Sequence, residues 1–241
     1  MPSALALVVL ALAGCSGEDP APAPRPPVPP GNGVITGTVT LSGKVSEMRE
    51  IPNSSCHGGG ANVREETIVS DAAGRLANVV VYLKDGPPVS VPAKPVLLDQ
   101  VGCRYVPHVV AVRTGQTLRV KSSDPTLHNV HGQSNANPAF NFGMTGAGQT
   151  RDLTFARPET FKVTCDVHPW MRAYVAVFDH PLFAVTGEGG TFEIRNVPPG
   201  AYTLVAWHER LGTREQQVTV PPEGGDDAPV GAGFTYGTAA K

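Results

Sequence analysis

A short loop between two expected strands carries three side chains that bind metals. Cys165, His168 and Met171 follow the spacing Cys-x2-His-x2-Met. Residues 160–164 before this loop and 174–178 after it alternate as β-strands do. The chain must therefore fold so that these two strands hold a thiol, an imidazole and a thioether close together.

A second imidazole comes from His128, within the stretch Leu-His-Asn-Val-His. Two His, one Cys and a weakly bound Met form the ligand set of blue-copper sites. Thiolate and thioether favour Cu(I), and imidazole suits both oxidation states, so such a site need not rearrange when an electron moves. Iron–sulfur clusters would need more thiolates, and a structural zinc site would usually have no Met ligand. The sequence therefore predicts one type 1 copper site.

Two spacings, Cys-x2-His-Pro-aromatic-Met-Arg and His-Asn-Val-His, resemble those of the cupredoxins. The resemblance implies that His128, Cys165 and His168 are equatorial copper ligands and that Met171 is the axial one. The alternative is a sandwich core that buries the Cys and the Met, with the His residues bound to nearby backbone groups. Four such donors at the family spacing favour the copper site.

Two residues beside these ligands are expected to support them. The resemblance implies that Asn129 joins the strand of His128 to the loop of Cys165 by hydrogen bonds, and Thr164 directly precedes that Cys. Hydrogen bonds of this kind fix the orientation of metal ligands.

Three further His residues are weighed as ligands. His131 lies three residues after His128, so in an extended strand its side chain is on the opposite face. His108 begins a strand, and His57 has no further ligand at a suitable spacing. A surface or supporting role is predicted for His131 and His108, and whether any of the three binds metal stays open.

Pro169 and Trp170 follow the loop ligand His168. Electron-transfer cupredoxins expose the edge of this His through an apolar patch, so the resemblance implies that both residues contact a redox partner, whose identity the sequence does not give. The alternative is that Trp170 packs inward, since a single large apolar residue proves little.

Composition indicates an all-β protein. The 241 residues include 27 Gly and 24 Pro, which punctuate short apolar alternations, and no long stretch has helical periodicity. The net charge of −2 and the lack of a basic run give no reason to expect nucleic-acid binding.

Two β-sandwiches are predicted, one inserted in the other or joined to it. The phrase Gly-Gly-Thr-Phe-Glu-Ile-x-x-Val-Pro-Pro-Gly-Ala-Tyr-Thr-Leu resembles the carboxypeptidase regulatory-like, transthyretin-type sandwich, but its opening Gly-x-x-x-Gly-x-Val strand stands far upstream, at residues 33–39. We therefore assign residues 33–87 and 180–237 to a split sandwich of this type and residues 88–179 to a Greek-key cupredoxin. The insertion is expected to leave the copper end facing away from the host domain.

The N-terminal residues resemble a bacterial lipoprotein signal. A small, apolar run ends in Leu-Ala-Gly-Cys, so residues 1–14 are predicted to be a signal peptide and Cys15 a lipidated residue. Residues 15–32 are rich in Pro and Ala and are expected to be an extended tether. The protein is then exported and lipid-anchored to a bacterial membrane, facing the periplasm or the exterior. An unprocessed apolar tail is the alternative.

Cys56 and Cys103 remain after lipid and copper are assigned. An oxidising compartment favours a disulfide between them. Metal binding by Cys56 together with His57 is the alternative.

These features predict a membrane-tethered electron carrier that cycles between Cu(I) and Cu(II). No Ser/His/Asp or paired-carboxylate pattern is present, and four protein ligands leave no evident open copper position, so an enzyme is not predicted. Two alternatives share much of the sequence pattern: a surface binding or assembly module with structural copper, and a copper storage or delivery protein.

Overall fold

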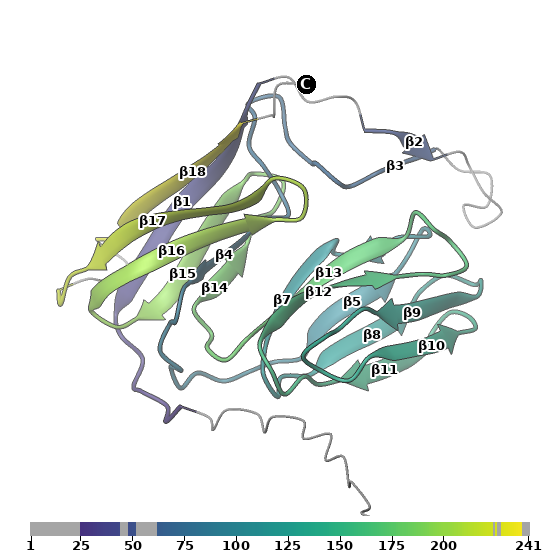
Figure 1. The fold of residues 1–241 in the computed structure, drawn as a ribbon, viewed down its shortest axis with the longest axis horizontal. Helices are drawn as coiled ribbons and strands as arrows, with labels where there is room; N and C mark the ends of the chain where they lie inside the picture. The colour runs from purple at the N-terminus through teal and green to yellow at the C-terminus, as the bar shows by residue number, and fades with distance from the viewer. Residues whose placement is uncertain (1–24, 44–47, 52–61, 224, 226–227, 238–241) are drawn as a thin grey trace, which may run out of the picture.

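The computed structural model describes residues 25–43, 48–51, 62–223, 225 and 228–237. Within these residues every regular element is a β-strand, which confirms the predicted all-β class. The strands form two separate bodies, each with its own buried apolar core (Figure 1). Among the described residues, no helix has the length and apolar character needed to cross a membrane.

The first body is a sandwich of a three-stranded sheet, ordered β15-β1-β18, and a four-stranded sheet, ordered β14-β4-β16-β17. Its strands come from both ends of the chain: β1 (Gly33–Ser42), β4 (Val80–Leu83), β14 (Phe183–Val185), β15 (Thr191–Val197), β16 (Gly200–His208), β17 (Gly212–Val220) and β18 (Val230–Gly237).

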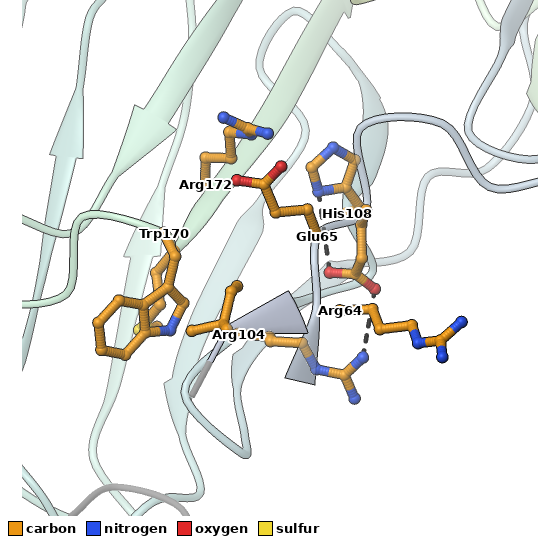
Figure 2. A pocket seen from close by; sticks show the side chains of 9 residues that line it. Arg64, Glu65, Arg104, His108, Trp170 and Arg172 are labelled. Atoms are coloured by element: carbon orange, nitrogen blue, oxygen red, sulfur yellow. Dashed lines mark hydrogen bonds and ion pairs between the residues drawn. The ribbon is translucent and has the colours of Figure 1, made fainter. Parts of the chain in front are cut away.

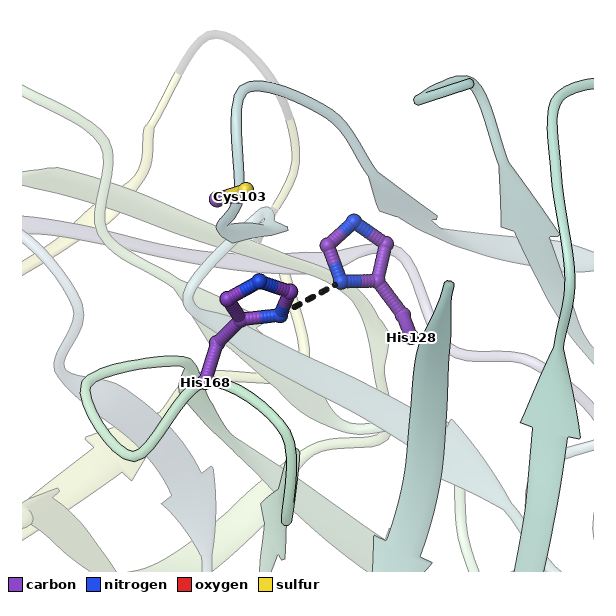
Figure 3. A group of neighbouring side chains, drawn as sticks. All are labelled: Cys103, His128 and His168. Carbon is purple, nitrogen blue, oxygen red and sulfur yellow. Dashed lines mark hydrogen bonds between the residues drawn. The ribbon is translucent and has the colours of Figure 1, made fainter. Parts of the chain in front are cut away.

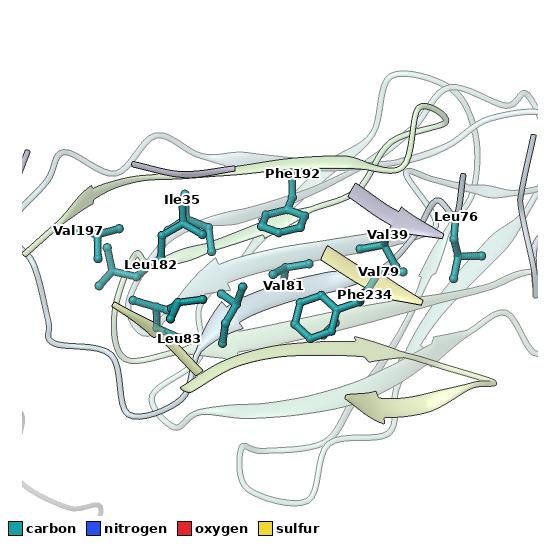
Figure 4. Close-up of a cluster of buried hydrophobic side chains, with 14 of the residues drawn as sticks. Ile35, Val39, Leu76, Val79, Val81, Leu83, Leu182, Phe192, Val197 and Phe234 are labelled. Atoms are coloured by element: carbon teal, nitrogen blue, oxygen red, sulfur yellow. The ribbon is translucent and has the colours of Figure 1, made fainter. Parts of the chain in front are cut away.

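Strand β1 closes this body. It pairs antiparallel with β15 and parallel with β18, so the N-terminal segment completes a sheet that the C-terminal segment begins. Strands from the two ends of the chain thus form one sheet. Side chains of β1, β4, β15 and β18 then meet in one apolar core, where Ile35, Phe192 and Phe234 lie between the sheets (Figure 4).

The second body lies between β4 and β14 in the chain. Its five-stranded sheet is ordered β10-β9-β12-β13-β7 and its four-stranded sheet β11-β8-β5-β6. The strands are β5 (Val96–Gln100), β6 (Tyr105–Val106), β7 (Val109–Arg113), β8 (Leu118–Ser122), β9 (His128–Gly132), β10 (Phe140–Met144), β11 (Thr150–Leu153), β12 (Glu159–Thr164) and β13 (Arg172–Phe178).

Alternation along β9 decides which side chains enter this second core. His128 and Val130 are buried, whereas Asn129 and His131 point outward and are partly exposed. Strand β9 pairs with β12, which leads to Cys165, so the fold brings the two predicted metal-binding stretches to the same end of one sheet.

The two bodies share an apolar interface. Val80 of the first body packs with Val109 and Ala176 of the second, and all three are buried. Aromatic rings surround them, including Tyr174 and Trp207, whose centroids are 5.4 Å apart. The bodies are therefore packed against each other in addition to being joined by two chain crossings.

A buried contact between a His and a Glu lies beside this interface. The turn between β16 and β17 places a Glu209 oxygen 2.5 Å from Nε2 of His108, and their side chains are only 7% and 3% exposed. Burial acts to raise the pKa of Glu209, but hydrogen bonds from His108 and Tyr174 outweigh it and hold the pKa below its ordinary value. Burial and the Glu209 charge together raise the pKa of Tyr174 to about 12.

A glycine pair tests the closing role of β1. A Cβ on Gly37 would lie 1.8 Å from the backbone oxygen of Ala232 in β18, whereas a Cβ on Gly231 meets nothing within 4 Å. We expect Gly37→Ala to lower the free energy of unfolding by about 1–3 kcal/mol through overpacking. Gly231→Ala should stay within about 0.5 kcal/mol of the wild type in urea unfolding. Equal effects would contradict the pairing of β1 with β18.

The His108–Glu209 contact is tested by a double-mutant cycle with His108→Ala and Glu209→Gln. We expect a coupling of about 0.5–3 kcal/mol at neutral pH, because the pair is buried and in direct contact. A lowered folded-state pKa stabilises the protein above the unfolded-state value and loses that effect as pH falls through the folded-state value. The loss caused by Glu209→Gln should therefore shrink below about pH 4.5, the ordinary value for the group.

The exposed pair Arg119–Asp152 is the control for this cycle. Water screens its charges, so no coupling is expected in urea unfolding of the metal-free protein. A His108–Glu209 coupling no larger than that of the control would contradict the structural role of the buried pair.

Candidate metal centre

His128, Cys165 and His168 converge at one end of the second body. Nδ1 of His128 lies 3.1 Å from Nδ1 of His168, and Sγ of Cys165 lies 3.7 Å from the same His168 nitrogen. His128 begins β9, Cys165 directly follows β12, and His168 lies in the loop before β13. Figure 3 shows the two imidazoles facing each other.

The loop closes on itself through the backbone. The amide of Cys165 donates to the carbonyl of Met171 at 3.1 Å, and the amide of Met171 donates to the carbonyl of His168 at 2.9 Å. These bonds hold the loop in a tight turn. Cys165 and Met171 are 2% and 1% exposed, while His168 is half-buried. The thiol and thioether thus lie inside the protein and one imidazole reaches its surface.

His128 is oriented by a carboxylate. Its Nε2 lies 2.8 Å from Oδ2 of Asp124, which suits an Nε2–H donor and turns Nδ1 toward His168. Burial acts to lower the pKa of His128, but hydrogen bonds with Cys165 and Asp124 outweigh it and raise the pKa above its ordinary value.

Cys165 is held as a strong donor. Burial acts to raise the pKa of its thiol, but hydrogen bonds from His128 and from the backbone amides of Asn129, His168 and Val167 outweigh it and lower the pKa. The thiolate is the form that binds metals. In the metal-free protein, these donors therefore stabilise the charge that a bound cation would otherwise stabilise.

Asn129 joins the two metal-binding stretches as expected. Its Oδ1 accepts from the backbone amide of Asp166 at 2.6 Å, and its Nδ2 donates to the Asp166 carboxylate at 2.8 Å. Thr164 takes part through its carbonyl, which accepts from the hydroxyl of Tyr105 at 3.1 Å. The same hydroxyl donates to the carbonyl of Asn129 at 2.6 Å, so Tyr105 links β9 to β12 through these two carbonyls.

The other His residues lie away from the converging nitrogens. His131 points outward and pairs with Asp166 at 3.0 Å. His108 lies at the contact between the two bodies, 4% exposed and in contact with Glu209, so the prediction of an exposed His at the start of this strand is wrong. His57 is outside the described residues. The structure gives His131 and His108 partners other than the metal-binding group.

The side chain of Trp170 is partly buried and is held by contacts within the protein. Its indole nitrogen donates to the carbonyl of Cys103 at 3.1 Å, and its ring centroid lies 5.2 Å from that of His168. It also lines a small pocket whose other lining residues include 51 and 64–66, from the connection between β1 and β4 (Figure 2). Pro169, in contrast, is exposed.

This pocket corrects the expectation that the copper end faces away from the host domain. The segment between β1 and β4, which includes β2 (Glu50–Ile51) and β3 (Val63–Arg64), crosses to the Trp170 side of the loop. Arg172 donates a hydrogen bond to Thr67 of this segment. Arg104 forms an ion pair at 3.4 Å with Glu66 of the same segment. The split host thus covers one side of the site, because its long connection is anchored there by polar contacts.

Cys103 lies beside the two imidazoles. Its sulfur is within 4.8 Å of nitrogen atoms of His128 and His168 (Figure 3). Cys103 is disulfide-bonded, whereas Cys165 is a free thiol, so Cys165 is the residue able to supply a thiolate to this group. Cys15 and Cys56 lie outside the described residues, and the pairing of Cys56 with Cys103 stays a prediction.

Peptide mapping tests that pairing. Digestion without reductant should release the peptides of Cys56 and Cys103 as one linked species, which separates after reduction. The Cys165 peptide is the internal control and should be alkylated without reduction once the protein is unfolded. Free thiols at both Cys56 and Cys103 would contradict the predicted disulfide.

Sequence reasoning missed Asp124 and Tyr105. Asp124 stands four residues before His128, next to a Pro, and no motif marks it. Tyr105 reads as an ordinary strand residue. The spacing of Asp124 from His128 is the one signal that could have suggested its role.

No family model matches the chain, and no curated protein matches it. Among solved structures, the Cu-containing nitrite reductase (NirK) from Thermus scotoductus SA-01 is 24% identical over 38% of this chain and 25% of that one, with a TM-score of 0.33. Amicyanin from Paracoccus versutus is 25% identical over 41% of this chain and 96% of that one, with a TM-score of 0.32.

These matches correct one prediction. We expected a chain that is not an enzyme, and a nitrite reductase is among the structures that resemble it, although the chain spans only a quarter of that protein. The exclusion of an enzyme is therefore withdrawn. The predicted signal peptide and lipidated Cys15 lie outside the described residues.

Proposed function

We propose that the chain is a type 1 copper protein that carries single electrons. The observation that supports this most is how close the donor atoms lie to one another. Nδ1 of His168 is 3.1 Å from Nδ1 of His128 and 3.7 Å from Sγ of Cys165. In this proposal these three side chains are the equatorial ligands, and the buried thioether of Met171 is the axial one.

The donor set suits copper better than zinc or an iron–sulfur cluster. One thiolate, two imidazoles and a thioether combine soft and borderline donors, as blue-copper sites do. Bound copper would supply one-electron chemistry between Cu(I) and Cu(II). The four side chains are positioned by strand ends and by backbone hydrogen bonds of the loop, so they can stay in place in both oxidation states.

The surface around His168 supports docking of a redox partner. Leu127 and Val167 are 47% and 49% exposed, and Pro169 is exposed between His168 and Trp170. None of these three residues lines the pocket beside residues 64–66, and together they give exposed apolar surface next to the two His residues in the chain. We propose that the partner approaches there and that the half-buried imidazole of His168 passes the electron.

Export and a lipid anchor complete the proposal. A Cys at position 15 after an apolar run, followed by a Pro-rich stretch, suits a domain held near a bacterial membrane. A redox partner in the same compartment would then meet the copper site at high local concentration.

Visible spectroscopy of ligand variants tests the function. The copper-loaded wild type should show intense blue or green absorption that disappears on reduction, since a Cu(II)–thiolate bond gives this colour. Cys165→Ser should remove the colour and most of the copper affinity, because a hydroxyl is a poor ligand for soft metals. Met171→Leu should keep the colour and raise the reduction potential, since the axial thioether tunes more than it binds.

His128→Ala and His131→Ala form a matched pair, because both residues lie on β9 but face opposite sides. The first should lose the colour and the second should keep it. A colourless wild type that binds copper would favour storage or delivery, and a wild type that binds none would favour a surface binding module.

A further inference from the structure

We propose that Asp124 is a positioning residue that lowers the reduction potential of the copper site through His128, and that a backbone anion nest at residues 102–103 holds it in place. This inference rests on the proposed copper function. It concerns an interaction with the far nitrogen of one ligand, not a further ligand.

The contact between the two side chains is buried. Oδ2 of Asp124 lies 2.8 Å from Nε2 of His128, and the side chains are 9% and 0% exposed. Water therefore screens the carboxylate charge weakly, and its effect on the imidazole is larger than that of a surface carboxylate. Among the described residues, no Lys or Arg forms an ion pair with Asp124, so His128 is the basic side chain that it faces.

Two consecutive backbone amides hold the carboxylate from the other side. The amide of Gly102 donates to Oδ1 at 2.7 Å, and the amide of Cys103 donates to Oδ2 at 2.9 Å. Both residues have positive φ, 61° and 52°, which turns successive N–H groups toward one point. Such a backbone nest binds anions.

The contacts of Asp124 suit a carboxylate that accepts from several N–H groups. The amides of Gly102 and Cys103 each donate to one of its oxygens, and Nε2 of His128 faces the oxygen that Cys103 also contacts. This contact turns the other ring nitrogen of His128, Nδ1, toward His168.

A carboxylate on the far nitrogen makes an imidazole a more basic ligand. The more basic ligand stabilises Cu(II) more than Cu(I), because Cu(II) carries the greater positive charge. Removing the charge should therefore raise the reduction potential while the metal-bound atoms, and hence the colour, are retained. A purely structural role for Asp124 predicts loss of stability without this shift.

The test compares Asp124→Asn and Asp124→Glu with the wild type and with Asp152→Asn, which alters an exposed carboxylate on β11. Asp124→Asn should weaken Cu(II) binding by about 10–100-fold, the effect typical of losing such a partner. Cu(I) binding should change less, and the potential should rise by about 59 mV for each tenfold difference between them. Asp124→Glu keeps the carboxylate, so its reduction potential should stay closer to that of the wild type than that of Asp124→Asn does. Asp152→Asn should leave the potential unchanged.

A measurement on the metal-free protein keeps the inference separate from the copper function. ¹⁵N NMR of the wild type should show His128 with its proton on Nε2 and slow exchange of that proton, and Asp124→Asn should lose this signature. A wild type in which Nε2 of His128 carries no proton would overturn the inference. So would a coloured, folded Asp124→Asn with an unchanged potential, while a wild type without copper colour would instead overturn the proposed function.

Discussion

The pairing of β1 with β15 and β18 is the constraint on which the rest of the structure depends. The first body cannot close until residues 33–42 reach strands more than 140 positions further along the chain. The second body is held as a guest whose ends leave β4 and return at β14, two neighbouring strands of one sheet of the first body. Neighbouring attachment points let the guest sandwich form its own core without distorting the host. They also bring β7 and β13 against the host, where Val109 and Ala176 pack on Val80.

This arrangement has a consequence for the metal centre that a simple insertion would not have. The connection between β1 and β4 is long, and it is anchored on the guest by Glu66 and Thr67. It shields Trp170 and the Met171 side of the loop, leaving a pocket of about 10 Å³, room for a single water at most. Leu127 and Val167, the chain neighbours of the two imidazoles, do not line this pocket and stay exposed. The host therefore limits the directions from which another protein can reach the imidazole.

Local patterns predicted the parts of the structure that depend on local chemistry. The Cys-x2-His-x2-Met spacing placed a turn between two strands, and alternation placed His128 inward and His131 outward. The Gly-x-x-x-Gly-x-Val strand at residues 33–39 stands far upstream of the rest of the pattern that it resembles, and this separation predicted a split sandwich. Contacts between distant residues were not predictable: Glu209 meets His108 across 101 positions, and Trp170 is covered by a segment that reads as irregular and polar. Neither contact is marked by a sequence motif, because a buried contact needs only complementary groups that the fold brings together.

The same distinction explains how the metal-binding end can be rigid before any metal binds. Buried polar groups are costly unless each has a partner. Here the partners come from separate elements: Asp124 satisfies His128, the nest at residues 102–103 satisfies Asp124, and Tyr105 satisfies the carbonyls of Asn129 and Thr164. Each contact fixes the next, so the imidazole and the thiol are oriented by hydrogen bonds that reach back into the sandwich core. Such an arrangement of fixed donors suits the one-electron exchange that we propose for this chain.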